Sequence, residues 1–144
     1  MAADDQVFAM NEHLVPAELL TGIAEMDGQH ERLFDEMQKV KDAFLAVEAD
    51  HGAALQLMSH LADDLEAHFA WEEAAARHIG IPFESHAREH AKIGAFVRAK
   101  IDEISGGDCN IPALMVFMER CFETHMVHHD LKLGRQLLPA EALD

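Results

Sequence analysis

Apolar residues recur every three or four positions in four stretches of the chain, and this spacing is typical of one face of an amphipathic α-helix. The first stretch runs from Leu19 to Val47 and is interrupted by 51–52, His-Gly. The second ends at 80–82, Gly-Ile-Pro, where glycine and proline are typical helix terminators. Residues 1–17 show only weak periodicity, so we expect them to form an arm or loop ahead of the first helix.

The two remaining stretches follow proline and glycine breaks of the same kind. The third begins after Pro82 and stops at 105–108, Ser-Gly-Gly-Asp. Asn110 is a suitable N-cap for the fourth, and Pro112 is tolerated in its first turn. This last stretch continues to about Leu138.

Four long amphipathic stretches with short connections, and no alternating strand pattern, predict an all-α protein. We expect an antiparallel up-down-up-down four-helix bundle over residues 18–138, with an N-terminal arm at 1–17. The length of 144 residues suits one domain, so we expect 1–144 to form a single unit.

Composition and charge restrict the function. Lys and Arg number 11 against 27 Asp and Glu, giving a formal net charge of −16, which argues against nucleic acid and membrane surfaces as partners. The 49% hydrophobic content is too high for a disordered acidic chain. No signal peptide or membrane-spanning run is evident, so we expect a cytoplasmic protein, monomeric, with an unknown protein as a possible further partner.

Histidine is the unusual residue, with 11 copies. Six ionisable side chains fall in phase with the apolar stripes: His30, His68, Glu72, His86, His90 and His125. Burying them without partners would cost several kcal/mol, roughly, whereas a metal ion in the bundle core would satisfy them.

Each motif is weak by itself. His86-x-x-x-His90 puts two imidazoles one turn apart on one helical face, but a chain rich in histidine contains such pairs by chance. His68-x-x-x-Glu72 also suits a surface pair, and a lone His30 also suits a core histidine with a protein partner. The joint pattern is more specific, because alternating helix directions bring these residues to heights that agree within about two turns.

The order H…H-x-x-x-E…H-x-x-x-H…H-x-x-x-x-D resembles that of the hemerythrins, and more closely the bacterial hemerythrins (bacteriohemerythrins). The flanking residues 21–30, Thr-Gly-Ile-Ala-Glu-Met-Asp-Gly-Gln-His, and 80–82 agree as well, and the resemblance covers roughly 19–138. The family is an oxygen-binding four-helix bundle with a non-haem di-iron site.

The resemblance implies two iron ions (Fe²⁺/Fe³⁺) joined by an oxo or hydroxo bridge. The implied ligands are three histidines on one iron, two on the other, and two bridging carboxylates: His86, His90 and His125; His30 and His68; Glu72 and Asp130. The neighbours of these ligands that we expect to line an apolar O2 pocket are Leu33, Phe69, Ile93, Phe122 and Met126. The same five also suit plain core packing.

Asp130 is the ligand that spacing alone supports least. Five residues after His125, it lies about 140° around an ideal helix, and His129 fits the stripe better. The family pattern selects Asp130, which a local widening of the helix would permit. We expect the other histidines to be surface residues: His13, His51, His60, His78 and His128.

The chain departs from the family at several neighbouring positions, which puts pocket size and O2 affinity in doubt. Cys121 stands where relatives usually carry Trp, and Phe122, Ile81 and Ala76 replace common Leu, Tyr and Met. Cys121 suits a small buried residue or an iron-proximal redox thiol. Cys109 lies in a predicted loop, and with no C-x-x-C neither a disulfide framework nor a zinc ribbon is expected.

We therefore expect reversible O2 binding, for storage, delivery or sensing, by a protein that is not an enzyme. The alternative on the same cluster is a di-iron redox enzyme: an oxidase, peroxidase or nitric oxide scavenger. A ferritin-like site needs two E-x-x-H motifs, and only Glu48 to His51 supplies one. A bundle that has lost its metal is disfavoured by the intact ligand pattern.

Overall fold

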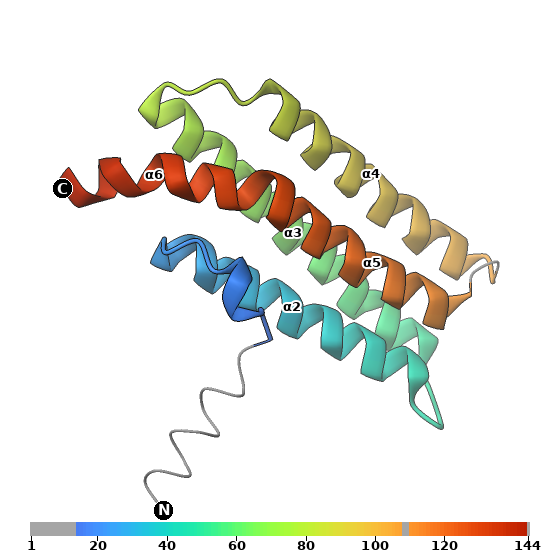
Figure 1. Cartoon of the computed structure of the whole chain (residues 1–144). Coiled ribbons are helices and arrows are strands. Elements are labelled where there is room, and N and C mark those ends of the chain that lie inside the picture. The colour runs from blue at the N-terminus through green and yellow to red at the C-terminus, as the bar shows by residue number, and fades with distance from the viewer. Residues whose placement is uncertain (1–13, 108–109, 144) are drawn as a thin grey trace, which may run out of the picture.

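The computed structural model describes residues 14–107 and 110–143, with side chains to residue 139. Figure 1 shows long helices that lie along one another. The elements are η1 (Ala17–Leu19), α2 (Ala24–Leu45), α3 (His51–Ile79), α4 (Glu84–Ser105), α5 (Ile111–His125), the π-helical η2 (Met126–Asp130) and α6 (Leu131–Leu143). Within the described residues there is no strand, so the prediction of an all-α four-helix bundle is confirmed.

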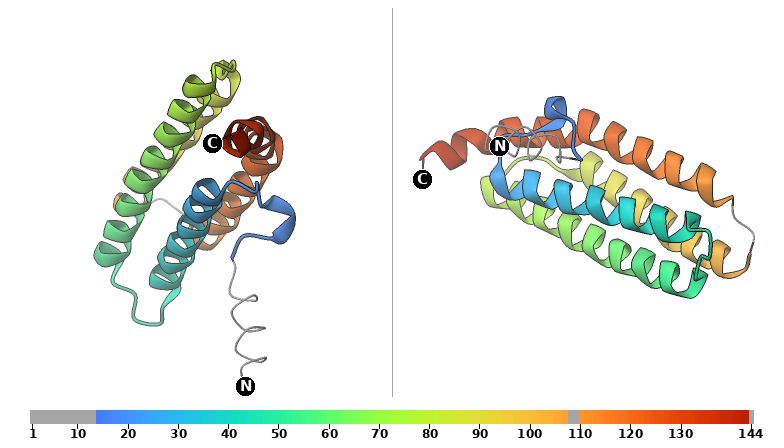
Figure 2. Two further views of the ribbon diagram at one scale, coloured as in Figure 1. Left: turned by 90° about the vertical axis from the view of Figure 1, so that its left-hand side faces the viewer. Right: turned by 90° about the horizontal axis from the view of Figure 1, so that it is seen from below.

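The chain turns back at each connection between rods, as the colour sequence in Figure 1 shows. α5, η2 and α6 continue one another and form the fourth rod, and the two views of Figure 2 show the rods lying side by side. α3 packs against α2 and α4, and α2 also packs against α5. No described helix combines the length and hydropathy needed to cross a bilayer.

The first helix begins later than its apolar pattern predicts. Leu19 belongs to a short 3₁₀ turn, and Gly22 then takes a φ of +86°, a conformation that suits glycine. The Asp27 carboxylate accepts hydrogen bonds from the Thr21 backbone N–H (2.8 Å), the Thr21 hydroxyl (2.7 Å) and the Gly22 N–H (3.0 Å). These bonds hold an irregular loop in place, and α2 starts at Ala24.

Caps define the ends of the other helices. Asp50 is the N-cap of α3 and accepts from the Ala53 N–H (3.0 Å), so His51 opens a helix that the sequence placed slightly later. Asn110 caps α5 in the same way through the Ala113 N–H (3.1 Å), as predicted. Gly80, with φ +74°, ends α3 at the expected break.

The buried apolar side chains form two clusters. The large cluster lies between the C-terminal part of α2, most of α3, the C-terminal part of α4, and α5; its members include Leu33, Met37, Val40, Phe44, Met58, Leu61, Leu65, Phe69, Ile93, Val97, Leu114, Met118, Phe122 and Met126. The small cluster consists of Ile23, Met26, Ala76, Leu133 and Leu137.

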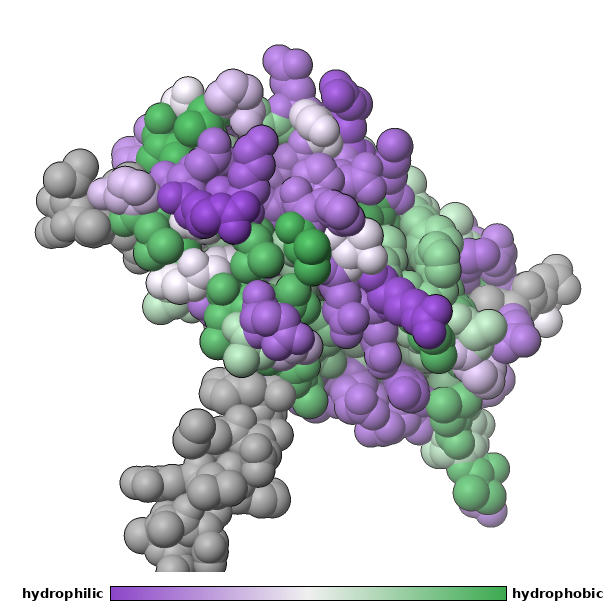
Figure 3. Space-filling view, in the orientation of Figure 1, coloured by the Kyte–Doolittle hydropathy of each residue, from purple (hydrophilic) through white to green (hydrophobic). Residues whose placement is uncertain are grey.

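Val47, where the first predicted stretch ends, and Leu57, an apolar residue of the second, lie outside both clusters. Val47 follows the end of α2 and is fully exposed at the α2–α3 connection, where Figure 3 shows a hydrophobic projection. Leu57 is 40% exposed because Met58, its neighbour in the chain, takes the buried position. Of the predicted arm at 1–17, residues 1–13 lie outside the described part of the chain. The fourth rod extends beyond the predicted end at Leu138, to Leu143.

Candidate metal centre

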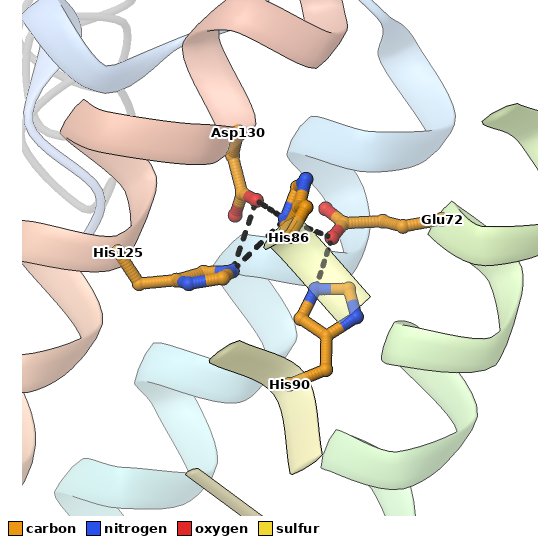
Figure 4. A group of neighbouring side chains, drawn as sticks. All are labelled: Glu72, His86, His90, His125 and Asp130. Carbon is orange, nitrogen blue, oxygen red and sulfur yellow. Dashed lines mark hydrogen bonds and ion pairs between the residues drawn. The ribbon is translucent and has the colours of Figure 1, made fainter. Parts of the chain in front are cut away.

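Seven ionisable side chains converge inside the bundle, between the large and the small cluster. Along α2, α3 and the fourth rod, the small-cluster residues lie on one side of them and most of the large cluster lies on the other. All seven are at most 7% exposed; they are His30, His68, Glu72, His86, His90, His125 and Asp130. Figure 4 shows five of them pointing toward a common point from α3, α4 and the fourth rod.

The two oxygens of Glu72 face different histidines. Oε1 lies 2.9 Å from His90 Nε2 and 3.4 Å from His86 Nε2. Oε2 lies 3.1 Å from His68 Nε2 and 3.6 Å from His30 Nε2. One carboxylate therefore reaches two separate sets of imidazoles.

Asp130 divides its oxygens in the same way. Oδ1 lies 3.0 Å from His86 Nε2 and 3.1 Å from His125 Nε2, and Oδ2 lies 2.9 Å from His30 Nε2. Two groups of potential metal ligands result, and both include the two carboxylates. We call them the three-histidine half (with His86, His90 and His125) and the two-histidine half (with His30 and His68).

A single turn of π-helix puts Asp130 in this position. Within η2 the Leu131 N–H bonds to the Met126 carbonyl, five residues back, so the helix is locally wider. His125 and Asp130, five residues apart, thus share a face. His129 is only half-buried; its ring centroid lies 4.9 Å from that of His86, and it belongs to neither ligand group.

Many of the buried polar atoms in this centre have no hydrogen-bond partner. His30 Nε2 and both Asp130 oxygens are examples, although they lie at contact distance from one another. Within the described part of the chain, every such buried atom except one belongs to the seven residues. Close donor atoms without hydrogen bonds are what a site for cations requires, and imidazole with carboxylate suits iron and zinc.

Charge coupling inside the cluster is strong. Burial opposes ionisation of Glu72, but the four histidines around it hold its pKa well below the usual range. Burial would lower the pKa of His30, yet the carboxylates of Asp130 and Glu72 raise it to about 9. Without a metal ion, the centre therefore retains anionic carboxylates beside a protonated imidazole.

Neighbouring side chains orient two of the imidazoles. His68 Nδ1 lies 2.7 Å from Gln29 Oε1, and Gln29 Nε2 in turn donates to Glu25 (2.9 Å). A ring N–H donated to Gln29 leaves the lone pair of Nε2 directed into the centre. Phe69 stacks on His90, with ring centroids 3.9 Å apart. The sequence interpretation missed Gln29; its place one turn after Glu25 and beside His30 was the available signal.

The five predicted pocket residues are all buried in the large cluster. Of the predicted surface histidines, four are exposed, namely His51, His60, His78 and His128. Cys121 is a free, half-buried thiol, and burial raises its pKa, which disfavours the reactive thiolate. His13 and Cys109 lie outside the described residues.

The fold and the site together define a helical bundle with a buried histidine–carboxylate centre for cations. Comparison with family models assigns residues 21–137 to the Hemerythrin HHE cation binding domain. The chain therefore belongs to the hemerythrin family. Comparisons with curated proteins and with solved structures give no match.

Proposed function

We propose that the chain holds two iron ions in this centre and binds O2 reversibly there, for storage, delivery or sensing. The observation that carries the proposal is the division of Glu72 and Asp130, each of which presents one oxygen to each half. Carboxylates placed in this way suit a pair of like-charged ions held close together. Bound between these residues, two ferrous ions would supply the two-electron chemistry that reversible O2 binding requires.

The protein would contribute different numbers of ligand atoms to the two irons and an apolar environment that excludes water. The three-histidine half offers one imidazole more than the two-histidine half, so we assign the O2 position to the side of His30 and His68. The apolar side chains proposed to exclude water there are Leu33, Phe69, Ile93, Phe122 and Met126. Gln29 fixes the ring of His68, and thereby the direction of its donor nitrogen.

The direct test is an optical spectrum of the anaerobically reduced, iron-loaded protein before and after air, together with an iron count. We expect two irons per chain and a visible absorption that appears with O2 and disappears under argon over repeated cycles. A spectrum that changes once and does not return, with release of peroxide, would instead support the di-iron redox enzyme.

The ligand assignment has its own matched pair of variants. Asp130→Ala should abolish binding of both irons, because Asp130 contacts histidines of both halves. His129→Ala removes a neighbouring imidazole that belongs to neither ligand group, so its iron content should stay at two. Equal iron loss in the two variants would refute the assignment of Asp130.

A further inference from the structure

A second group of metal-ligating side chains lies on the side of the α2–α3 interface: Glu36 of α2, with His60 and Asp64 of α3. One donor atom from each lies within 4.8 Å of the other two. We call these three residues the outer cluster. In the described part of the chain it is the one such group apart from the metal centre, and it shares no residue with that centre.

The pattern along α3 connects the two sites. Side chains able to bind metals recur at every fourth position, namely His60, Asp64, His68 and Glu72. Residues four apart lie on the same face of a helix, so these donors form one row. The inner pair belongs to the buried centre, and the outer pair faces the surface, where His60 is 65% and Asp64 27% exposed.

The distances in the outer cluster suit a small cation. His60 Nε2 lies 3.2 Å from Glu36 Oε1 and 3.3 Å from Asp64 Oδ2. Ligands at about 2.0–2.1 Å from a tetrahedral zinc ion are separated by about 3.3 Å. The imidazole nitrogen is therefore already at the required spacing from both carboxylates.

The second carboxylate oxygen of Glu36 gives an independent indication. Oε2 is buried and has no hydrogen-bond partner, and it is the one such atom outside the metal centre in the described residues. The Glu36 side chain is only 13% exposed. An unpaired buried oxygen is costly, and a bound cation would remove that cost.

The charges around Glu36 agree with this geometry. Burial and the nearby Asp64 carboxylate raise the pKa of Glu36 to about 8, although Arg32 and Lys39 oppose the shift. Lys39 is itself engaged by Asp35, with Nζ and Oδ2 3.0 Å apart. Two carboxylates crowded together in this way repel each other, and a dication between them would relieve that repulsion.

We propose that Glu36, His60 and Asp64 bind one divalent transition-metal cation of the zinc type, separate from the di-metal centre. One imidazole and two carboxylates suit such an ion, and exposed His60 leaves room for water as a further ligand. The ion would join α2 to α3, the helices that carry His30 and His68. It would therefore brace that pair of helices from the outside.

The test counts the zinc bound by iron-loaded protein after equilibrium dialysis against Zn²⁺. We expect wild type to bind one zinc per chain more than His60→Ala or Glu36→Gln, whatever the state of the inner centre. The matched controls are His78→Ala, another exposed histidine of α3, and Asp42→Asn, which removes one exposed negative charge from α2. Both controls should bind as much zinc as wild type.

Thermal unfolding supplies a second measurement. Zinc should raise the Tm of wild type and of both controls, and this increase should be absent in His60→Ala and Glu36→Gln. No difference in bound zinc between wild type and His60→Ala would overturn the proposal. An equal loss in the control variants would also overturn it, because the binding would then follow surface charge alone.

Discussion

The two ends of the bundle are stabilised in different ways. Beyond the metal centre on one side lies the large cluster, with long apolar side chains from all four rods. On the other side lies the small cluster, with Ile23, Met26, Ala76, Leu133 and Leu137. Since buried apolar area supplies most of the stability of a domain, we expect the large-cluster end to stay folded without metal. The small-cluster end depends more on the centre and on the loop that Asp27 holds.

Metal removal should produce the largest difference between the ends. Chelation, or Glu72→Ala, should remove the metal ions that would connect the four rods. A ligand whose free concentration is 1,000 times its Kd stabilises a fold by about 4 kcal/mol. Amide hydrogen exchange should accelerate in the first turn of α2 and in α6, and change little in the C-terminal half of α2. Glu66→Gln, an exposed acid on the same helix, is the control. Uniform acceleration along every helix would contradict the comparison.

A cavity in the large cluster should reduce the stability of the whole molecule. Leu61 is 1% exposed, and Leu61→Ala should lower the free energy of unfolding by about 2–5 kcal/mol. Leu57→Ala, one turn earlier and 40% exposed, should change it far less. Denaturant unfolding measures both. The loss of unfolding free energy in Leu61→Ala should be the same with and without metal. A loss that depends on metal would contradict the proposed difference between the two ends.

A crowded contact at the small-cluster end offers a test that acts on that end alone. A Cβ on Gly134 would lie 2.7 Å from Cβ of Thr21, closer than such atoms approach, so α6 and the loop before α2 must separate in Gly134→Ala. We expect a loss of about 1–3 kcal/mol and faster metal release. Gly94→Ala, where a Cβ meets nothing within 4 Å, is the matched control. Unchanged metal release would show that this contact does not support the centre.

The smallest effects should come from two aspartates that accept backbone hydrogen bonds, one at each end. Asp27 holds the loop before α2, and Asp50 caps α3 at the large-cluster end. Asp27→Ala and Asp50→Ala should each cost about 1 kcal/mol in thermal unfolding. Only Asp27→Ala should accelerate metal release to a chelator, because it loosens the helix that carries His30. Equal release rates in the two variants would remove the distinction between the ends.

Much of the fold could be predicted from the sequence because helix breaks and periodicity are local signals. Gly80 and Asn110 mark their helix ends as predicted. The start of α2 could not be predicted in this way, because Leu19 and Ile23 continue the apolar pattern of the helix. The hydrogen bonds by which Asp27 holds the preceding loop are not visible in that pattern.

The site shows the same limit. Six of the seven positions in the candidate centre can be found from periodicity, but the convergence of Asp130 depends on one π turn that no spacing rule for an ideal helix includes. The roles of Gln29 and of the outer cluster could not be predicted from the sequence for a related reason. Each depends on which side chain of α3 lies opposite α2, a matter of packing between helices that periodicity within one helix does not determine.

The π turn between His125 and Asp130 also affects which insertions and deletions the fourth rod can accept. It accommodates one residue more than an α-helix would need to join the same two faces. Deleting exposed Val127 would leave Asp130 four positions after His125, on the same face of a regular helix, with Leu133 still turned inward. A deletion within α5 would instead rotate everything beyond it by about 100°. The fourth rod thus carries one position at which the chain tolerates a change in length.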